Sequence, residues 1–281
     1  MFLNSVILVL QEILEAALLI SVMLMFTHLF NQLWQRSFLL THHWAYYSIL
    51  IGVFGAAIFA HYTPVISTWF DYVGQEIVNA TIHLLSLTIL MVLAFAVPGR
   101  RLDAKPHTRS TLIAACMAGV VLLSITREGS EIMQYIGGIA SQPDNFSPVI
   151  FGGILGAGIG MSTGILLYYG LVSLNSKLAF RTGLVLLCLI AGNMAAQIAL
   201  LLNQADWLPY TRVAWNSSGL IPETSIVGHL LYALVGYEAT PSVSQVVCYG
   251  LGIILVVMSP LCRRLWRFNT LPEVTLQEAS A

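Results

Sequence analysis

The chain has 281 residues, of which 57% are hydrophobic and only 9% are charged, and its mean hydropathy is +0.81. A soluble domain carries about 25% charged residues, so the composition excludes an ordinary water-soluble fold and predicts that lipid surrounds much of the chain. The formal net charge is −1 and no basic run occurs, so we expect no nucleic-acid partner. The four cysteines include no Cys-x-x-Cys pair, and neither a disulfide framework nor a zinc site is indicated.

The N-terminal segment is predicted to be a membrane helix that the protein retains. No Lys or Arg precedes the apolar run, and the apolar character continues through Phe30. A secretory signal peptide has a charged beginning and a shorter apolar region. We therefore take this segment as the first spanning helix.

Seven segments are apolar and long enough to cross a membrane, which takes about 20 residues. They are residues 3–30, 45–62, 75–97, 110–139, 149–172, 179–202 and 243–261, with approximate bounds. The second is the least clearly bounded, because the mixed aromatic stretch 61–74 that follows it suits an interfacial position. The fold class is therefore predicted to be all-α, an integral membrane bundle of seven transmembrane helices. It forms one domain over residues 1–268, followed by a polar cytoplasmic tail at 269–281.

The basic residues predict the orientation of the bundle. Ten of the twelve lie after the first, third, fifth and seventh spans: Arg36, Arg100, Arg101, Lys105, Arg109, Lys177, Arg181, Arg263, Arg264 and Arg267. Because Lys and Arg concentrate in short cytoplasmic loops, the N-terminus is predicted outside and the C-terminus in the cytoplasm. The outer side then carries the acids Asp71, Asp144, Asp206, Glu223 and Glu238, which are either simply solvated or attract cations.

Two short motifs indicate an internal repeat. The first span carries QEILE, from Gln11 to Glu15, and the fourth carries REGSE, from Arg127 to Glu131. Equivalent positions three spans apart run in opposite directions across the membrane. This predicts a 3+3 inverted repeat with halves 1–97 and 110–202, the extra helix 243–261, and a substrate site where the halves meet.

Each motif places two glutamates three residues apart, and therefore on one face of a helix. The pairs are Glu12 with Glu15 and Glu128 with Glu131. An ionised residue at the centre of a spanning helix costs about 2.5–3.5 kcal/mol, so the four carboxylates are expected to face one another and a cation. A structural ion pair with Arg127 is the alternative, but it does not explain a second pair. Carboxylate oxygens suit hard or borderline cations such as iron or manganese.

REGSE in one membrane helix and a partner motif ending LEAAL in the first helix resemble the oxidase-dependent iron permease family. This family includes the fungal high-affinity iron permease and the permease of the bacterial Efe-type uptake system. The stretch from Ala214 to Gly250 also resembles the family's outer loop and last helix, notably Gly236-Tyr237 followed by Pro241-Ser242.

The resemblance implies seven membrane helices, iron as the transported substrate and no permanently bound cofactor. It assigns iron-handling roles to Glu12, Glu15, Glu128 and Glu131. It also implies an extracytoplasmic iron oxidase or iron-binding protein as partner. The first motif departs from the family pattern, with Gln11 in place of Arg and Ile13 in place of Gly, which makes the site more negative.

Supporting roles are predicted for six further residues: Arg127, Gln11, Glu76, His83, Tyr237 and Glu238. Glu76 and His83 lie seven residues apart on one helix face, where His83 is either an ion ligand or proton acceptor, or a hydrogen-bonded packing histidine. Tyr237 and Glu238 lie on the outer side near the last span, where they would help admit ions.

Two other patterns in the later spans predict helix packing. Asn193 and Gln197 are one turn apart in the sixth span and are expected to make interhelical hydrogen bonds. Gly152, Gly156, Gly160 and Gly164 form a ladder of small positions in the fifth span, within the bundle or between subunits.

We therefore predict an iron permease rather than an enzyme, in a bacterial inner membrane and compatible with a homo-oligomer. The alternatives are a metal-sensing or accessory subunit, or a permease for another metal cation. An intramembrane metal oxidoreductase is less favoured, because helix-bundle di-iron sites use Glu-x-x-His pairs and this chain has none. The chain also has no phosphate-binding loop of the GxxxxGK type, which argues against direct use of ATP.

Overall fold

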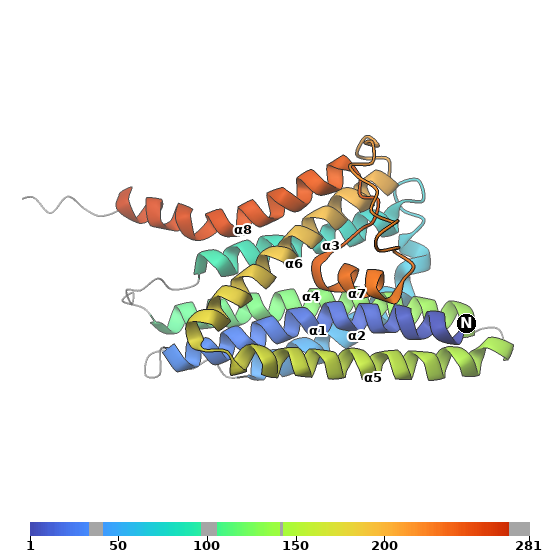
Figure 1. Ribbon diagram of the computed structural model, residues 1–281, viewed down its shortest axis with the longest axis horizontal. Helices are drawn as coiled ribbons and strands as arrows, with labels where there is room; N and C mark the ends of the chain where they lie inside the picture. Colours follow the sequence, from blue (N-terminus) through green and yellow to red (C-terminus); the bar gives the residue numbers. More distant parts are fainter. Residues whose placement is uncertain (34–41, 97–105, 141–142, 270–281) are drawn as a thin grey trace, which may run out of the picture.

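The computed structural model describes residues 1–33, 42–96, 106–140 and 143–269, which form eight α-helices, and a long segment, residues 205–242, precedes the last of them (Figure 1). The helices are α1 (Phe2–Leu33), α2 (His43–Ile66), α3 (Gly74–Ala96), α4 (Pro106–Ala140), α5 (Pro143–Ser173), α6 (Ser176–Gln204), α7 (Ile226–Val235) and α8 (Val243–Asn269). The basic residues Arg36, Arg100, Arg101 and Lys105 and the predicted tail beyond residue 269 lie outside the described residues.

Six helices, α1 to α6, are long and apolar enough to cross a membrane, and they coincide with the first six predicted spans. The seventh predicted span is also helical. Its described apolar part, Val243–Ser259 of α8, is shorter than the other six. The all-helical membrane architecture predicted from composition is therefore confirmed.

Two local predictions need correction. The second span does not end at residue 62, because α2 continues through Pro64 to Ile66. A tight turn follows, in which Phe70, Asp71 and Tyr72 all have positive φ angles, of 51°, 61° and 71°. The second correction is α7, a ten-residue helix that was not predicted.

Local sequence defines the ends of α7. The side chain of Ser225 accepts a hydrogen bond from the backbone N–H of Gly228 at 3.0 Å and so caps the first turn. At the other end Gly236 has a φ of 69°, a left-handed conformation that glycine adopts without steric cost. The Cα of Gly236 also lies against Asn193 of α6, where an added Cβ would be 2.5 Å from the amide oxygen.

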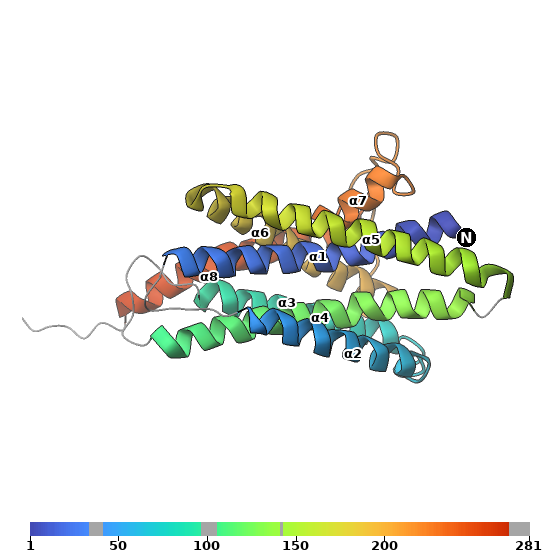
Figure 2. The ribbon, with the colours of Figure 1, turned by 90° about the horizontal axis from the view of Figure 1, so that it is seen from below.

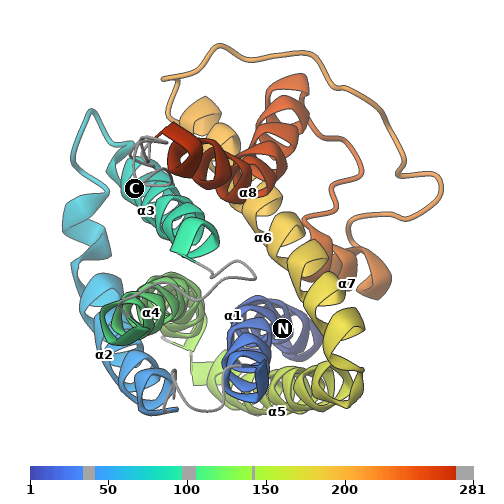
Figure 3. The same cartoon turned by 90° about the vertical axis from the view of Figure 1, so that its left-hand side faces the viewer.

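The helices α1 and α4 occupy the middle of the bundle and run in opposite directions (Figures 1 and 2). The helix α5 lies along α1 and α2 lies along α4, as the end-on view shows (Figure 3). The glycine ladder of α5 faces α1: an added Cβ would lie 2.5 Å from the Val6 carbonyl oxygen at Gly156 and 2.6 Å from Ala17 Cβ at Gly164. The predicted packing role of this ladder is therefore fulfilled within the bundle.

A cluster of buried apolar side chains fills one half of the bundle. It draws on every long helix, α1 to α6 and α8, and its fully buried members include Met23, Phe30, Leu90, Met117 and Val120. The outward faces carry large exposed apolar side chains, such as Phe54 on α2 and Leu166 on α5, which are 68% and 72% exposed. Apolar faces of this kind suit contact with lipid acyl chains. The glutamate motifs of α1 and α4 lie in the other half of the bundle.

Candidate metal centre

The antiparallel packing of α1 and α4 places the two glutamate motifs opposite each other. Ser5 Oγ of α1 lies 3.2 Å from the Tyr135 hydroxyl of α4, and the Thr27 hydroxyl of α1 lies 3.5 Å from Met117 Sδ. The glutamates lie between these two contacts. As a result, carboxylate oxygens of Glu12, Glu128 and Glu131 all lie within 4.8 Å of one another.

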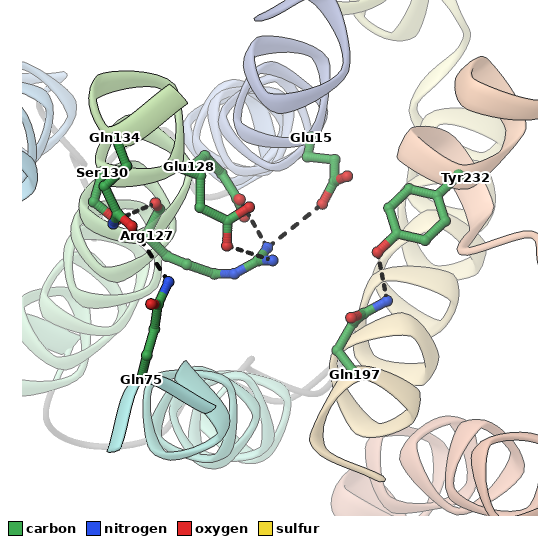
Figure 4. A network of polar contacts seen from close by, with 9 residues as sticks. Glu15, Gln75, Arg127, Glu128, Ser130, Gln134, Gln197 and Tyr232 are labelled. Carbon is green, nitrogen blue, oxygen red and sulfur yellow. Dashed lines mark hydrogen bonds and ion pairs between the residues drawn. The ribbon is translucent and has the colours of Figure 1, made fainter. Parts of the chain in front are cut away.

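Arg127 neutralises part of this negative charge. Its Nη1 donates to Glu128 Oε2 at 2.7 Å, and its Nη2 contacts Glu131 Oε1 at 2.9 Å. The arginine side chain is buried, and Figure 4 shows its guanidinium directed toward the carboxylates of α1 and α4. Its Nε has no hydrogen-bond partner among the described residues. The ion pair that the sequence offered as an alternative is therefore present, and it involves two of the candidate ligands.

Glu15 occupies a different place from the other three glutamates. Its Oε2 lies 3.9 Å from Arg127 Nη1, and it does not belong to the group of three converging carboxylates. Glu15 is nevertheless almost as buried as Glu128, with 12% and 7% of their side chains exposed. The structure therefore brings together three of the four motif glutamates, with the fourth beside the arginine.

The charges in this group do not balance. With all four carboxylates ionised and Arg127 protonated, four negative charges face one positive charge. Glu12 is 7% exposed, and its Oε2 has no hydrogen-bond partner among the described residues. A buried carboxylate oxygen without a partner is unfavourable unless it gains a proton or a cation. The arrangement can therefore accept a hard or borderline metal cation at Glu12, Glu128 and Glu131.

Neutral polar side chains surround the charged group (Figure 4). Gln75 of α3 donates to the side-chain oxygen of Gln134 of α4 at 3.3 Å. On the opposite side, Gln197 of α6 donates to the Tyr232 hydroxyl of α7 at 2.7 Å. The interhelical hydrogen bond predicted for Gln197 is thus present, whereas the Asn193 oxygen is buried without a partner in the described part of the chain.

Gln11, the residue before Glu12, contacts α7. Its Oε1 lies 2.9 Å from Nδ1 of His229. Neither His229 nor Tyr232 is among the predicted site residues, because the sequence analysis does not predict the helix that carries them. The signal was present in the serine and glycine that bracket Ile226–Val235.

The α3 candidates differ in burial. Glu76 is half-buried in the first turn, whereas His83 lies two turns deeper and is 6% exposed. His83 Nε2 has no hydrogen-bond partner among the described residues. No hydrogen bond at Nε2 therefore supports the alternative in which His83 is a hydrogen-bonded packing residue.

Tyr237 and Glu238 lie in the connection between α7 and α8, outside the carboxylate group. The Tyr237 hydroxyl donates to the Ile221 carbonyl oxygen at 3.0 Å and lies 2.7 Å from Ser217 Oγ. Glu238 Oε2 accepts a hydrogen bond from Gln245 Nε2 at 2.6 Å. Burial raises the pKa of the Glu238 carboxyl above its ordinary value, against the opposing effect of the Gln245 hydrogen bond. Both residues make hydrogen bonds that stabilise segment 205–242.

A helical bundle with six membrane-length apolar helices and buried, converging carboxylates defines an integral membrane protein of the ion-handling class. The model of the iron permease FTR1 family matches residues 2–262, and the chain belongs to this family. The family comprises permeases, so the protein is a membrane permease for iron and not an enzyme, as the sequence predicted.

Curated relatives agree with this family. The chain is 25% identical over 190 residues to the ferrous iron permease EfeU of Shigella flexneri, covering 64% of this chain and 80% of the relative. It is equally similar to EfeU of Escherichia coli O157:H7 and to the putative inactive ferrous iron permease EfeU of Escherichia coli strain K12. For both, the match covers 64% of this chain and 68% of the relative. No solved structure matches the chain.

Proposed function

We propose that this protein carries iron, in the ferrous state, across a bacterial inner membrane through a site formed by Glu12, Glu128 and Glu131. The observation that carries the proposal is the convergence of these three carboxylates from two antiparallel helices, with one oxygen of Glu12 left unpartnered. The ferrous state is taken from the names of the EfeU relatives. Three carboxylates bind a divalent ion through oxygen ligands that iron accepts.

Glu15 and Arg127 complete the site in this proposal. Glu15 supplies a fourth negative charge that attracts the ion, while Arg127 keeps the empty carboxylates partly neutralised. The protein can then hold four glutamates in one membrane region without an ion, because the guanidinium contacts Glu128 and Glu131 and lies near Glu15.

The helix contacts support an inverted repeat that relates α1–α3 to α4–α6. Such a repeat exchanges α1 with α4 and α2 with α5, so a contact of α1 with α5 requires one of α4 with α2. Both contacts occur, and both use glycines: Gly156 and Gly160 of α5 face α1, and Gly52 of α2 faces Ile125 of α4. In this scheme the ion site lies where the halves meet, and α8 is the seventh span.

We further propose that the N-terminus is outside and the C-terminus is in the cytoplasm. Lys177 and Arg181 lie in the first two turns of α6 and support this orientation. The beginning of α6 is at the end of the bundle where α1 ends and α2 begins (Figure 1), and basic residues mark the cytoplasmic side. The outer segment between α6 and α8 then faces the side on which an iron oxidase or iron-binding partner would deliver the ion.

Equilibrium binding tests the site separately from transport. Purified protein in lipid nanodiscs is titrated anaerobically with Fe²⁺, beside the variants Glu12→Gln, Glu128→Gln and Glu131→Gln. Each variant keeps the side-chain shape and removes one charge, and each should weaken binding by about tenfold or more. Asp206→Asn, at the outer end of α6, is the matched control. Unchanged affinity in all three glutamate variants would refute the site.

A further inference from the structure

Two buried acceptors on α3 have no partner in this structure. Asn79 and His83 are each 6% exposed, and the Asn79 Oδ1 and His83 Nε2 atoms make no hydrogen bond to the described residues. With its proton on Nδ1, the imidazole presents Nε2 as an acceptor. Buried acceptors are almost always satisfied, so a pair of unsatisfied ones on a single helix face points to a donor that arrives in another state.

The register between α3 and α4 places these acceptors at the level of Arg127. Residues 75, 79 and 83 share one face of α3, since each is one helical turn from the next. Gln75 is hydrogen bonded to Gln134 of α4, and the two helices run in opposite directions (Figure 1). Because the helices are antiparallel, four residues forward on α3 correspond to four residues back on α4. Asn79 is therefore level with Ser130, and His83 is level with Thr126.

The guanidinium of Arg127 therefore lies between two sets of acceptors. On one side it contacts Glu128 and Glu131, at 2.7 and 2.9 Å. On the other side is α3, which carries Gln75, as Figure 4 shows. The Nε of the arginine has no partner in its present position among the described residues. An arginine can donate five hydrogen bonds, and here it leaves part of that capacity unused.

A metal ion at the carboxylates would compete with Arg127 directly. Glu128 and Glu131 are both members of the converging group and both partners of the arginine. A cation bound there would repel the neighbouring guanidinium and take over the oxygens that it contacts. The displaced arginine would remain buried, and it would need new acceptors close by.

We propose that Asn79 and His83 receive the Arg127 side chain when a cation occupies Glu12, Glu128 and Glu131. This inference rests on the proposed ion site. It makes Asn79 and His83 positioning residues that act through Arg127, and not ligands of the ion. When the ion leaves, the arginine returns to Glu128 and Glu131. The protein thus carries its own competitor for the site, which keeps the bound ion exchangeable, as permeation requires.

A double-mutant cycle in Fe²⁺ affinity tests this proposal. The variants are Asn79→Leu and His83→Phe, which remove the acceptor and keep a similar volume, each made with Arg127 present and with Arg127→Gln. Thr81→Val, on the exposed face of α3, is the control. With Arg127 present, each α3 variant should weaken Fe²⁺ binding by about tenfold, because the displaced guanidinium loses a hydrogen bond. With Arg127→Gln, the same changes should leave the affinity unaltered.

The alternatives give different results in the same cycle. If Asn79 and His83 are direct ligands, their loss weakens binding equally in both backgrounds, and the proposal is overturned. If neither change alters the affinity in either background, it is overturned as well. Failure of the ion site itself is distinguishable, because Glu12→Gln and Glu128→Gln would then bind Fe²⁺ with the same affinity as the parent protein.

A second measurement keeps Arg127 in place, in case Arg127→Gln does not fold. Infrared difference spectra are recorded on adding Fe²⁺ to protein labelled with ¹⁵N-arginine. The parent should show a shifted guanidinium band that is altered in Asn79→Leu and His83→Phe. An identical arginine band before and after Fe²⁺ binding would overturn the proposal.

Discussion

Gln11 Oε1 of α1 lies 2.9 Å from Nδ1 of His229 on α7, and Gln11 immediately precedes the candidate ligand Glu12. One turn further along α7, the Tyr232 hydroxyl accepts a hydrogen bond from Gln197 of α6. The short helix α7 is thus hydrogen bonded to α1 and to α6. Any movement of α7 away from the bundle must break these two contacts.

We predict that Gln11→Ala and His229→Ala each lower iron uptake, by about fivefold, because each removes one hydrogen bond that holds α7 beside the site. The double variant should be no worse than either single variant, since the two residues share one contact. Uptake into proteoliposomes measures this, with the exposed His61→Ala as control. Fully additive losses would contradict a shared role.

Glu15 should matter less for binding than the three converging glutamates. It contacts Arg127 at 3.9 Å and lies outside the group. Glu15→Gln removes long-range attraction without removing a ligand, so its Fe²⁺ dissociation constant should rise less than that of Glu128→Gln. Parallel titrations of the two variants check this. A larger effect at Glu15 would show that Glu15 is itself a ligand of the ion.

Gly156 and Gly158 form a matched pair for testing the contact of α5 with α1. A Cβ at Gly156 would lie 2.5 Å from the Val6 carbonyl oxygen, whereas at Gly158 nothing lies within 4 Å. Both substitutions to alanine raise helix propensity equally. We expect Gly156→Ala to lower the unfolding free energy by about 1–3 kcal/mol and Gly158→Ala not to lower it. Thermal unfolding in detergent distinguishes them, and equal effects would argue against close α1–α5 packing.

Segment 205–242 should lose stability as pH rises, through Glu238. Its folded pKa is raised above the ordinary value of 4.5 by burial. The stabilisation is therefore fully present below the unfolded pKa and is lost as pH rises through the folded pKa. Glu238→Gln stays neutral, so its stability relative to the parent should increase from acidic to neutral pH. Unfolding temperatures measured across this range test the prediction, and a constant difference would contradict it.

The sequence was informative where helix periodicity governs the outcome. The spacing of three residues predicts that each glutamate pair lies on one helix face, and the glycine ladder of α5 predicts close packing without identifying α1 as its partner. The boundaries were less predictable. The predicted end of α2 at residue 62 is too early, because the mixed aromatic stretch 61–74 suggests an interfacial position, whereas the helix continues to Ile66.

Contacts between distant segments could not be read from the sequence. Gln11 and His229 are 218 positions apart, and their meeting depends on how α7 folds back onto α1. The position of Glu15 beside Arg127, outside the converging group, likewise depends on how α1 and α4 cross. The pattern of residues predicted four equivalent glutamates, and the packing makes them unequal.

Radioactive iron uptake into proteoliposomes tests the central claim most directly. The purified protein is supplied with ferrous or ferric iron at matched concentrations, beside Glu12→Gln, Glu128→Gln and Glu131→Gln, with Asp206→Asn as control. The account predicts ferrous uptake by the parent and the control, and its collapse in all three glutamate variants while the proteins remain folded. Unimpaired uptake in those variants would show that iron crosses the membrane by another route.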